Sequence, residues 1–358
     1  MKKLIWFCIL MLLLCGCAAE APDQETVWPS VVETEEPAAE TESAPEETTQ
    51  PEPVRTVMTF AGDCTLGCHS AHNRAGYGFL MTVEEQFDYP FQHVRSWFEN
   101  DDFTMVNLEG VLGEQGRPAG RKYAFRGYGS YVNILTGSSV EAVSLANNHT
   151  LDYGEAGYAE TKRLLDEAEV SYVEQNSGTL ITLDNGVTVG IYGTVYNSIH
   201  QAPVEEGIAA LREQGADIVI YAPHWGTEHS FDPTAQQVEL GHAAIDAGAD
   251  IVYGCHPHVL QPIEEYNGGV IYYSLGNFCF GGNIYPADYD SAIIQQEIIL
   301  DEDGTVTLGE RTIVPVSISS MEKRNNYQPI PYEKGTEEYD RVMSKLDGTY
   351  AGPNLPVH

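Results

Sequence analysis

Histidine, carboxylate and asparagine residues recur in short clusters between Asp63 and Asn277, and these are side chains that bind divalent metals. Neutral imidazoles together with carboxylates suit Zn, Mn or Fe, whereas an all-oxygen set would indicate Mg or Ca. Two such ions ~3.5–4 Å apart could activate a water molecule and stabilise both oxygens of a displacement at phosphorus or at a carbonyl carbon. The candidate residues are Asp63, Asn107, Glu109, Asn148, His149, Asp152, His224, Glu228, His256, His258 and Asn277.

Each cluster on its own has an ordinary structural explanation. Gly62-Asp63 is typical of a turn, Asn147-Asn148-His149 could cap a helix, and His224 could be a packed core histidine. His256-Pro257-His258 is more specific, because two imidazoles two residues apart can bind one metal ion. The case for a joint site therefore depends on whether the fold brings the clusters together.

Each cluster follows a short apolar run of the kind that forms a buried strand. Helical patterns over 155–169, 204–214 and 234–247 lie between these runs. This alternation predicts an α/β fold with a parallel or mixed sheet, whose ligands bind at the carboxyl ends of its strands. We therefore expect the polar clusters to meet at one edge. The predicted strands are 57–61, 103–106, 140–145, 217–221, 251–253 and 270–273.

The last part of the body reads as a hairpin followed by a helix. Residues 291–300 and 305–313 flank an Asp- and Gly-containing turn, and 337–346 has a helical pattern. The pattern shows one hydrophobic core, so we expect a single domain over 54–347 and a C-terminal tail over 348–358.

The order and spacing of these motifs are similar to those of the CapA-type poly-γ-glutamate capsule biosynthesis family. The resemblance rests on the segments 62–63, 107–110, 145–152, 224–228, 256–258 and 274–278. That family resembles the calcineurin-like metallophosphoesterases. The resemblance implies a two-sheet α/β sandwich flanked by helices, with two divalent transition-metal ions (Mn, Zn or Fe).

The resemblance also implies a role for each matching residue. Glu109 resembles the bridging carboxylate, a role that Asn107 could share, and His149 resembles the acid or substrate clamp. Asp152 could orient His149, while Glu228 and Asn277 could support neighbouring ligands. The implied metal ligands are Asp63, Glu109, Asn148, His224, His256 and His258.

Two positions bear on the implied activity. The phosphoesterases carry Asp-x-His at the first motif, but residue 65 is Thr in the segment Asp63-Cys64-Thr65. One metal position is then differently ligated or empty, unless His69 or His72 compensates. Arg126 is a candidate clamp for an anionic substrate, because a guanidinium matches carboxylate and phosphate; a surface ion pair is the alternative.

The N-terminus reads as an export signal and an anchor. Two lysines precede an apolar run over 4–14, which is too short to span a bilayer, and a Leu-Cys-Gly-Cys segment follows. It resembles a lipoprotein box, implying a signal peptide over 1–17 and lipidation of Cys17 on the outer face of the cell membrane. An ordinary signal peptide is the alternative. Residues 18–53 hold eleven acids, six prolines and no Lys or Arg, so we expect a disordered tether.

Net charge limits which partners the protein can bind, and the cysteine content raises the question of disulfides. The net charge of −35 excludes a nucleic-acid partner, which needs a basic surface. An anionic polymer or a small phosphoester would need local cations such as Arg126, Arg117, Arg121 or Lys122 to bind this acidic body. The body cysteines could form disulfides, as Cys255–Cys279 or Cys64–Cys68, or remain buried thiols.

Two function classes follow. The first is a surface-anchored, metal-dependent hydrolase that acts on a phosphoester or on a glutamyl amide bond. The second is a non-catalytic component of a capsule synthesis complex that binds or anchors poly-γ-glutamate.

Overall fold

Two mixed sheets and their covering helices are seen in the computed structural model, which describes residues 52–69, 72, 76–196 and 200–356. The predicted signal peptide, Cys17 and nearly all of the predicted tether lie outside these residues. None of the helices in the described ranges is long and apolar enough to cross a membrane.

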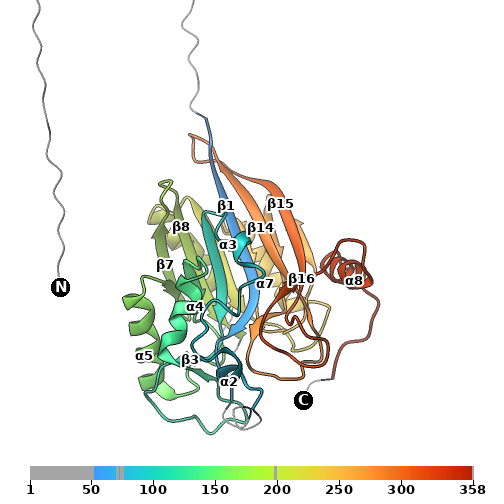
Figure 1. Ribbon diagram of the computed structural model, residues 1–358. Helices are drawn as coiled ribbons and strands as arrows, with labels where there is room; N and C mark the ends of the chain where they lie inside the picture. The colour runs from blue at the N-terminus through green and yellow to red at the C-terminus, as the bar shows by residue number, and fades with distance from the viewer. Residues whose placement is uncertain (1–51, 70–71, 73–75, 197–199, 357–358) are drawn as a thin grey trace, which may run out of the picture. The chain divides into compact units, whose positions relative to one another are not determined.

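The first sheet has eight strands in the order β16-β15-β14-β1-β2-β5-β6, and β13 pairs with the end of β1 (Figure 1). Strands β1, β2, β5 and β6 run parallel, while β14, β15 and β16 add antiparallel strands to β1. Its strands are β1 Val54–Thr65, β2 Phe103–Leu108, β5 Ala142–Ser144, β6 Ser171–Val173, β13 Asn277–Phe280, β14 Asp290–Leu300, β15 Val306–Ser317 and β16 Ile330–Pro331.

The second sheet has six strands in the order β11-β12-β10-β9-β8-β7, parallel at its centre and antiparallel at both edges. A short pair, β3 Val111–Leu112 with β4 Arg126–Gly127, stands apart. The strands of the second sheet are β7 Ser177–Thr182, β8 Thr188–Val195, β9 Ile218–His224, β10 Ile251–Tyr253, β11 Ile263–Tyr266 and β12 Gly269–Tyr272.

The inner core lies between the two sheets. Phe60 and Met105 of the first sheet belong to one buried cluster with Ile191, Ile220 and Tyr253 of the second. The rings of Phe60 and Tyr253 lie 5.3 Å apart, centroid to centroid. Apolar side chains at alternate positions of facing strands therefore hold the sheets together, as in other sandwiches.

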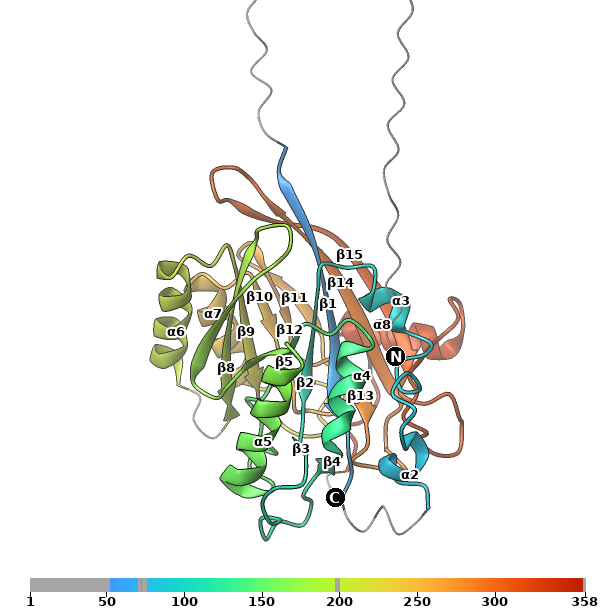
Figure 2. The same cartoon turned by 60° about the vertical axis from the view of Figure 1, so that its left-hand side comes forward.

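Helices cover the outer faces, as Figure 2 shows. Helices α6 and α7 pack on the second sheet through Ile208 and Leu240, and the helices α2 to α5 accompany the first sheet through residues such as Phe98 and Ile134. The α/β two-sheet sandwich flanked by helices is thus confirmed. The helices are α2 Phe79–Val83, α3 Arg95–Phe98, α4 Val132–Thr136, α5 Gly154–Glu167, α6 Gln201–Glu213, α7 Ala235–Asp246 and α8 Glu337–Leu346, with a 3-10 turn at Gly129–Tyr131.

Strand β1 passes unusually close to the loop before β13, and Gly62 permits this. A Cβ atom on Gly62 would lie 2.1 Å from the carbonyl oxygen of Gly276. The next residue, Asp63, donates its backbone N–H to that same oxygen at 2.8 Å, and Asp63 pairs with Asn277 across the two strands. The close approach therefore sets Asp63 beside the residues that follow β12.

The body cysteines Cys64, Cys68, Cys255 and Cys279 are all buried thiols outside any disulfide, so the buried-thiol alternative holds and neither predicted disulfide is formed. Burial raises the pKa of the Cys64 thiol to about 12. A thiol that stays protonated in an apolar core behaves as a small hydrophobic side chain.

Candidate metal centre

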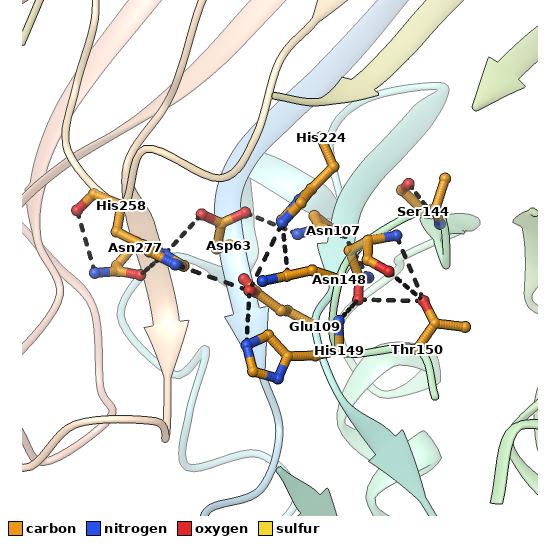
Figure 3. A network of polar contacts seen from close by, with 12 residues as sticks. Asp63, Asn107, Glu109, Ser144, Asn148, His149, Thr150, His224, His258 and Asn277 are labelled. Carbon is orange, nitrogen blue, oxygen red and sulfur yellow. Dashed lines mark hydrogen bonds and ion pairs between the residues drawn. The ribbon is translucent and has the colours of Figure 1, made fainter. Parts of the chain in front are cut away.

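The carboxyl ends of strands from both sheets meet at one place. Asp63 lies near the end of β1, Glu109 follows β2, His224 ends β9, and His256 and His258 follow β10. The loop after β5 supplies Asn148 and His149. Figure 3 shows several of these side chains pointing toward the Glu109 carboxylate from different strands. The predicted convergence of the clusters is therefore present in the fold.

Glu109 is the centre of this arrangement. Its side chain is fully buried, and neither carboxylate oxygen has a hydrogen-bond partner among the described residues. One of them, Oε1, lies 3.8 Å from each of three imidazole nitrogens, the Nε2 atoms of His149, His224 and His258. Burial raises the pKa of Glu109 to about 7. A buried carboxylate without donors is costly, and a bound cation would remove that cost.

Two groups of ligand atoms converge closely enough to hold metal ions. One atom each from Asp63, Glu109 and His258 lie within 4.8 Å of one another, and so do atoms from Glu228, His256 and His258. The shared residue, His258, joins the two groups. These nitrogen and oxygen donors fit divalent transition metals, and the unpaired oxygens of Glu109 support that fit.

Burial keeps two of the histidines in the neutral form that binds metals. Burial lowers the pKa of His224 well below its usual value, and it lowers the pKa of His256 to about 3. The Nδ1 atoms of both rings are buried without a hydrogen-bond partner in the described chain. Since a neutral imidazole offers a lone pair, both rings are suited to ligate a cation.

His258 differs because carboxylates surround it. Burial disfavours its charged form, but Glu109 and Asp63 outweigh burial and raise the pKa of His258 to about 10. Its Nδ1 atom lies 3.1 Å from Asp63 Oδ2 and 3.0 Å from Asn277 Oδ1. Asn277 also donates to the His258 carbonyl at 3.2 Å, so it contacts this histidine at both its ring and its backbone.

The loop that bears these histidines is strained. His256 and His258 have φ angles of 102° and 58°, values that favour glycine. Such strain persists only where the surroundings hold the loop in place, and it is common at ligand-binding loops. This conformation directs the two imidazoles of the His-Pro-His segment toward the carboxylates.

Asp152 holds His149 in position. The Nδ1 atom of His149 lies 2.6 Å from Asp152 Oδ2, and the fully buried Asp152 carboxylate also accepts the Phe125 backbone N–H at 2.7 Å. The Phe125 ring packs on the imidazole, with 4.4 Å between centroids. His149 Nε2 is left facing Glu109. Asp152 therefore contacts the side of the His149 ring that faces away from Glu109.

Asn107, Asn147 and Asn148 form the polar floor of the site. Asn107 donates to Asp63 Oδ1 at 2.8 Å and accepts from Asn147 at 3.1 Å. Asn147 also binds the backbone N–H of His149, which makes it a positioning residue that the sequence motif contained but did not single out. The Asn148 amide oxygen lies 2.9 Å from His224 Nε2. Asn107 thus acts through Asp63 in this geometry.

Glu228 and Arg126 are placed differently from their expected roles. Glu228 was expected to support a neighbouring ligand, but its carboxylate converges with His256 and His258 as a ligand would. Arg126 was expected to clamp an anion, but its guanidinium donates to the carbonyls of Glu114, Gln115 and Gly116 and stacks 3.5 Å above the Tyr153 ring. Arg126 is therefore occupied in holding its own loop.

The expected compensation for Thr65 by His69 or His72 is not seen among the described residues. Neither His69 nor His72 belongs to a converging ligand group in the described chain. His69 Nδ1 instead accepts the Ala124 backbone N–H at 3.3 Å. Thr65 itself is fully buried. Glu228, in the loop that follows β9 of the second sheet, is the carboxylate that converges with His256 and His258.

Comparison with known proteins places the chain in a family. The model of the family described as "Bacterial capsule synthesis protein PGA_cap" matches residues 57–282. The "PGA biosynthesis protein CapA" of Bacillus subtilis is 32% identical over 311 residues, which cover 80% of this chain and 77% of that protein. The "Capsule biosynthesis protein CapA" of Bacillus anthracis is 31% identical over 337 residues, with 81% and 77% covered.

Solved structures give a more distant likeness. The NAD nucleotidase (NadN) of Haemophilus influenzae aligns with a TM-score of 0.41 at 11% identity, covering 83% of this chain and 63% of that one. The family model spans most of the sandwich and includes every candidate ligand described above. The chain therefore belongs to the family of bacterial capsule synthesis proteins described as PGA_cap.

Proposed function

We propose that the chain is an exported, lipid-anchored hydrolase that uses two divalent transition-metal ions to cleave a glutamyl amide or a phosphoester bond in capsule polymer metabolism. The observation that carries the proposal is Glu109, a fully buried carboxylate without hydrogen-bond partners in the described chain, with three imidazole nitrogens 3.8 Å from one oxygen. Family membership supports a role with the capsule polymer poly-γ-glutamate. The Cys17 segment supports the anchor.

The candidate ligands would be Asp63, Glu109 and His258 for one ion, and Glu228 and His256 for the other, with Asn148 and His224 beside them; His258 lies in both ligand groups and would bind one of the two ions. Bound metal would supply a water of lowered pKa and charge stabilisation for the attacked oxygen. The remaining chemistry falls to the protein's own side chains.

His149 is placed to move the proton. In amide hydrolysis the water oxygen bonds to the carbonyl carbon, the C–N bond breaks, and the leaving amine receives a proton from His149 Nε2. The attacking water gives up a proton that restores Nε2, so one water is consumed overall. Asp152, 2.6 Å from Nδ1, keeps Nε2 directed toward the centre throughout.

A second candidate function is a non-catalytic, polymer-binding component of a capsule synthesis complex. The observation that favours it is Thr65, which replaces a metal-binding histidine of related hydrolases and has no substitute among the nearby histidines of the described chain. In that case the metal centre would bind polymer carboxylates and not activate water.

The experiment that separates the candidates measures metal content and turnover together. The mature chain is incubated with Mn²⁺, Zn²⁺ or Fe²⁺, analysed for bound metal, and assayed with γ-glutamyl oligomers and p-nitrophenyl phosphate. The hydrolase proposal expects bound metal, release of product, and loss of release in His149→Gln with metal retained. A metal-free wild-type protein overturns the proposal. Metal and oligomer binding without turnover would establish the second candidate.

A further inference from the structure

A cavity of about 400 Å³ opens directly beside the metal centre. Asn148 is part of its wall, and the amide oxygen of the same residue lies 2.9 Å from His224 Nε2. Tyr196, on another wall, stacks on the His256 ring with 5.0 Å between centroids. Asn148 and Tyr196 therefore link the cavity to the metal centre, and a molecule bound in the cavity would extend toward the candidate metal ligands.

The cavity wall carries one cation among its lining residues, Arg121. Its guanidinium donates through Nη1 to the Asn148 carbonyl and lies 3.6 Å from Asp152 Oδ1. The side chain is 48% exposed, and within the described chain its Nη2 and Nε groups donate to no protein acceptor. Arg121 is thus anchored at one nitrogen and has donors left to bind a carboxylate.

Two carboxylates line the same cavity, Glu155 and Glu174. Glu174 is paired with the Tyr158 hydroxyl at 2.6 Å and with the Lys162 ammonium at 3.0 Å, so much of its charge is balanced. Glu155 lies in the first turn of α5 and has no cationic partner among the described residues. The cavity therefore presents a guanidinium and an unbalanced carboxylate to the same bound molecule.

The positive charge of Arg121 and the negative charge of Glu155 together favour one part of a glutamyl polymer. An interior unit of poly-γ-glutamate carries a carboxylate and no cation, so Glu155 would repel it. A free amino terminus carries an ammonium and a carboxylate on the same carbon, which match Glu155 and Arg121 together. We propose that this cavity binds the free amino-terminal unit of a glutamyl chain, with its α-carboxylate on Arg121 and its ammonium facing Glu155.

The inference rests on the proposed function, since it names the part of the polymer that the centre would act on. It makes the protein act at a chain end, because the acidic body repels interior polyanion and only the terminus offers a cation. In this proposal the protein cation that binds the substrate is Arg121, so Arg126 is not needed for that role and can hold the loop before β4.

The test is a binding measurement that does not depend on turnover. Calorimetry with the full mature chain loaded with Mn²⁺ compares tri-γ-glutamate with its N-acetylated form, which lacks the ammonium. We expect the free form to bind at least tenfold more tightly. Arg121→Gln should weaken binding of both forms at least tenfold, and Glu155→Gln should abolish the preference between them. Arg163→Gln removes the same charge from an exposed position of α5 that does not line the cavity, and should bind as wild type does.

Equal affinity for the two oligomers, or equal binding by Arg121→Gln and Arg163→Gln, would overturn the inference. Thermal melting of each variant excludes misfolding as the cause of a loss. The two proposals fail separately. If both oligomers are hydrolysed equally well, the proposal of a terminal subsite is wrong and the hydrolase proposal stands. If the free terminus is preferred in binding but no hydrolysis occurs, the hydrolase proposal is wrong and the subsite proposal stands.

Discussion

His149 Nδ1 and Asp152 Oδ2 lie 2.6 Å apart, in a pair held by residues three positions apart in one loop. Because the buried carboxylate engages Nδ1, the opposite nitrogen, Nε2, faces Glu109 at 3.8 Å. A carboxylate behind a histidine fixes both its ring orientation and its tautomer. The loop after β5 therefore presents Nε2, the nitrogen that is free to exchange a proton, to the centre in one defined direction.

Replacing the carboxylate by an amide should lower turnover without removing the metal. In Asp152→Asn an amide oxygen can still accept from the Phe125 backbone, but the charge that steadies His149 is lost. We expect kcat to fall ~10–100-fold, with metal content unchanged. Steady-state kinetics together with metal analysis check this. Asp166→Asn, on the exposed side of α5, removes the same charge and should keep wild-type kinetics; a matching loss there would point to a general charge effect.

Glu109 and Glu228 should differ in how much of the metal-induced stabilisation depends on them. Glu109 Oε1 lies 3.8 Å from three imidazole nitrogens at the centre of the site, so Glu109→Gln should remove most of that stabilisation. Glu228 belongs to one ligand group, so Glu228→Gln should lower the bound metal from two ions to one. In the wild type, metal at a hundredfold excess over Kd should add about 2.7 kcal/mol per bound ion to the free energy of unfolding.

Thermal melting with and without metal, combined with metal analysis, measures both effects. Glu239→Gln, on the exposed face of α7, is the matched control and should respond to metal as wild type does. If Glu228→Gln still binds two ions, Glu228 is not a metal ligand and instead supports a neighbouring ligand, as the sequence motif first indicated.

Gly62 should tolerate no side chain. An alanine Cβ there would meet the Gly276 carbonyl oxygen at 2.1 Å, and this oxygen belongs to the backbone, which cannot turn aside as a flexible side chain can. Gly62→Ala should therefore cost about 1–3 kcal/mol or more of unfolding free energy and displace Asp63. Gly120 is the control, because a Cβ atom added there would have nothing within 4 Å, and Gly120→Ala should be neutral or slightly stabilising. Chemical denaturation of both variants compares the two sites, and equal stability would mean that the loop before β13 moves freely.

Much of the fold could be predicted because the apolar runs and the polar clusters alternate. The helix at 337–346 is confirmed at both ends, and the hairpin of β14 and β15 agrees with prediction to within a few residues. Strands β7 and β8 were missed. Gly190 and Gly193 interrupt the apolar pattern of β8, and they are required because a Cβ there would clash with Ala216 and with Glu174 and Ala146 respectively. The order of apolar and polar residues along one strand does not show which atoms of other segments will pack against it.

The sequence predicted which residues gather at the site better than it predicted what their side chains contact, and the reason is physical. Motif residues that act at a strand end, such as His224 and His258, could be found because the fold brings strand ends together. The roles of Arg121, Arg126 and Glu228 depend on loop paths that sequence spacing does not determine. Arg121 and Arg126 are five residues apart, yet Arg121 lines the cavity, whereas Arg126, at the start of β4, binds the backbone carbonyls of residues 114–116.

Glu141 should make the stability of the protein depend on pH far from the metal centre. Burial raises the pKa of Glu141 from 4.5 to about 7. The folded state therefore binds the proton more tightly than the unfolded state does, and this contribution to stability is present below pH 4.5 and lost as the pH rises toward 7. Glu141→Gln removes that dependence, and its amide oxygen can still accept the Thr104 N–H that Glu141 accepts at 2.6 Å. The variant should thus gain stability relative to wild type between pH 5 and pH 8, measured by chemical denaturation of the metal-free proteins. A constant difference between the two proteins across this range would show that Glu141 titrates alike in the folded and unfolded chain.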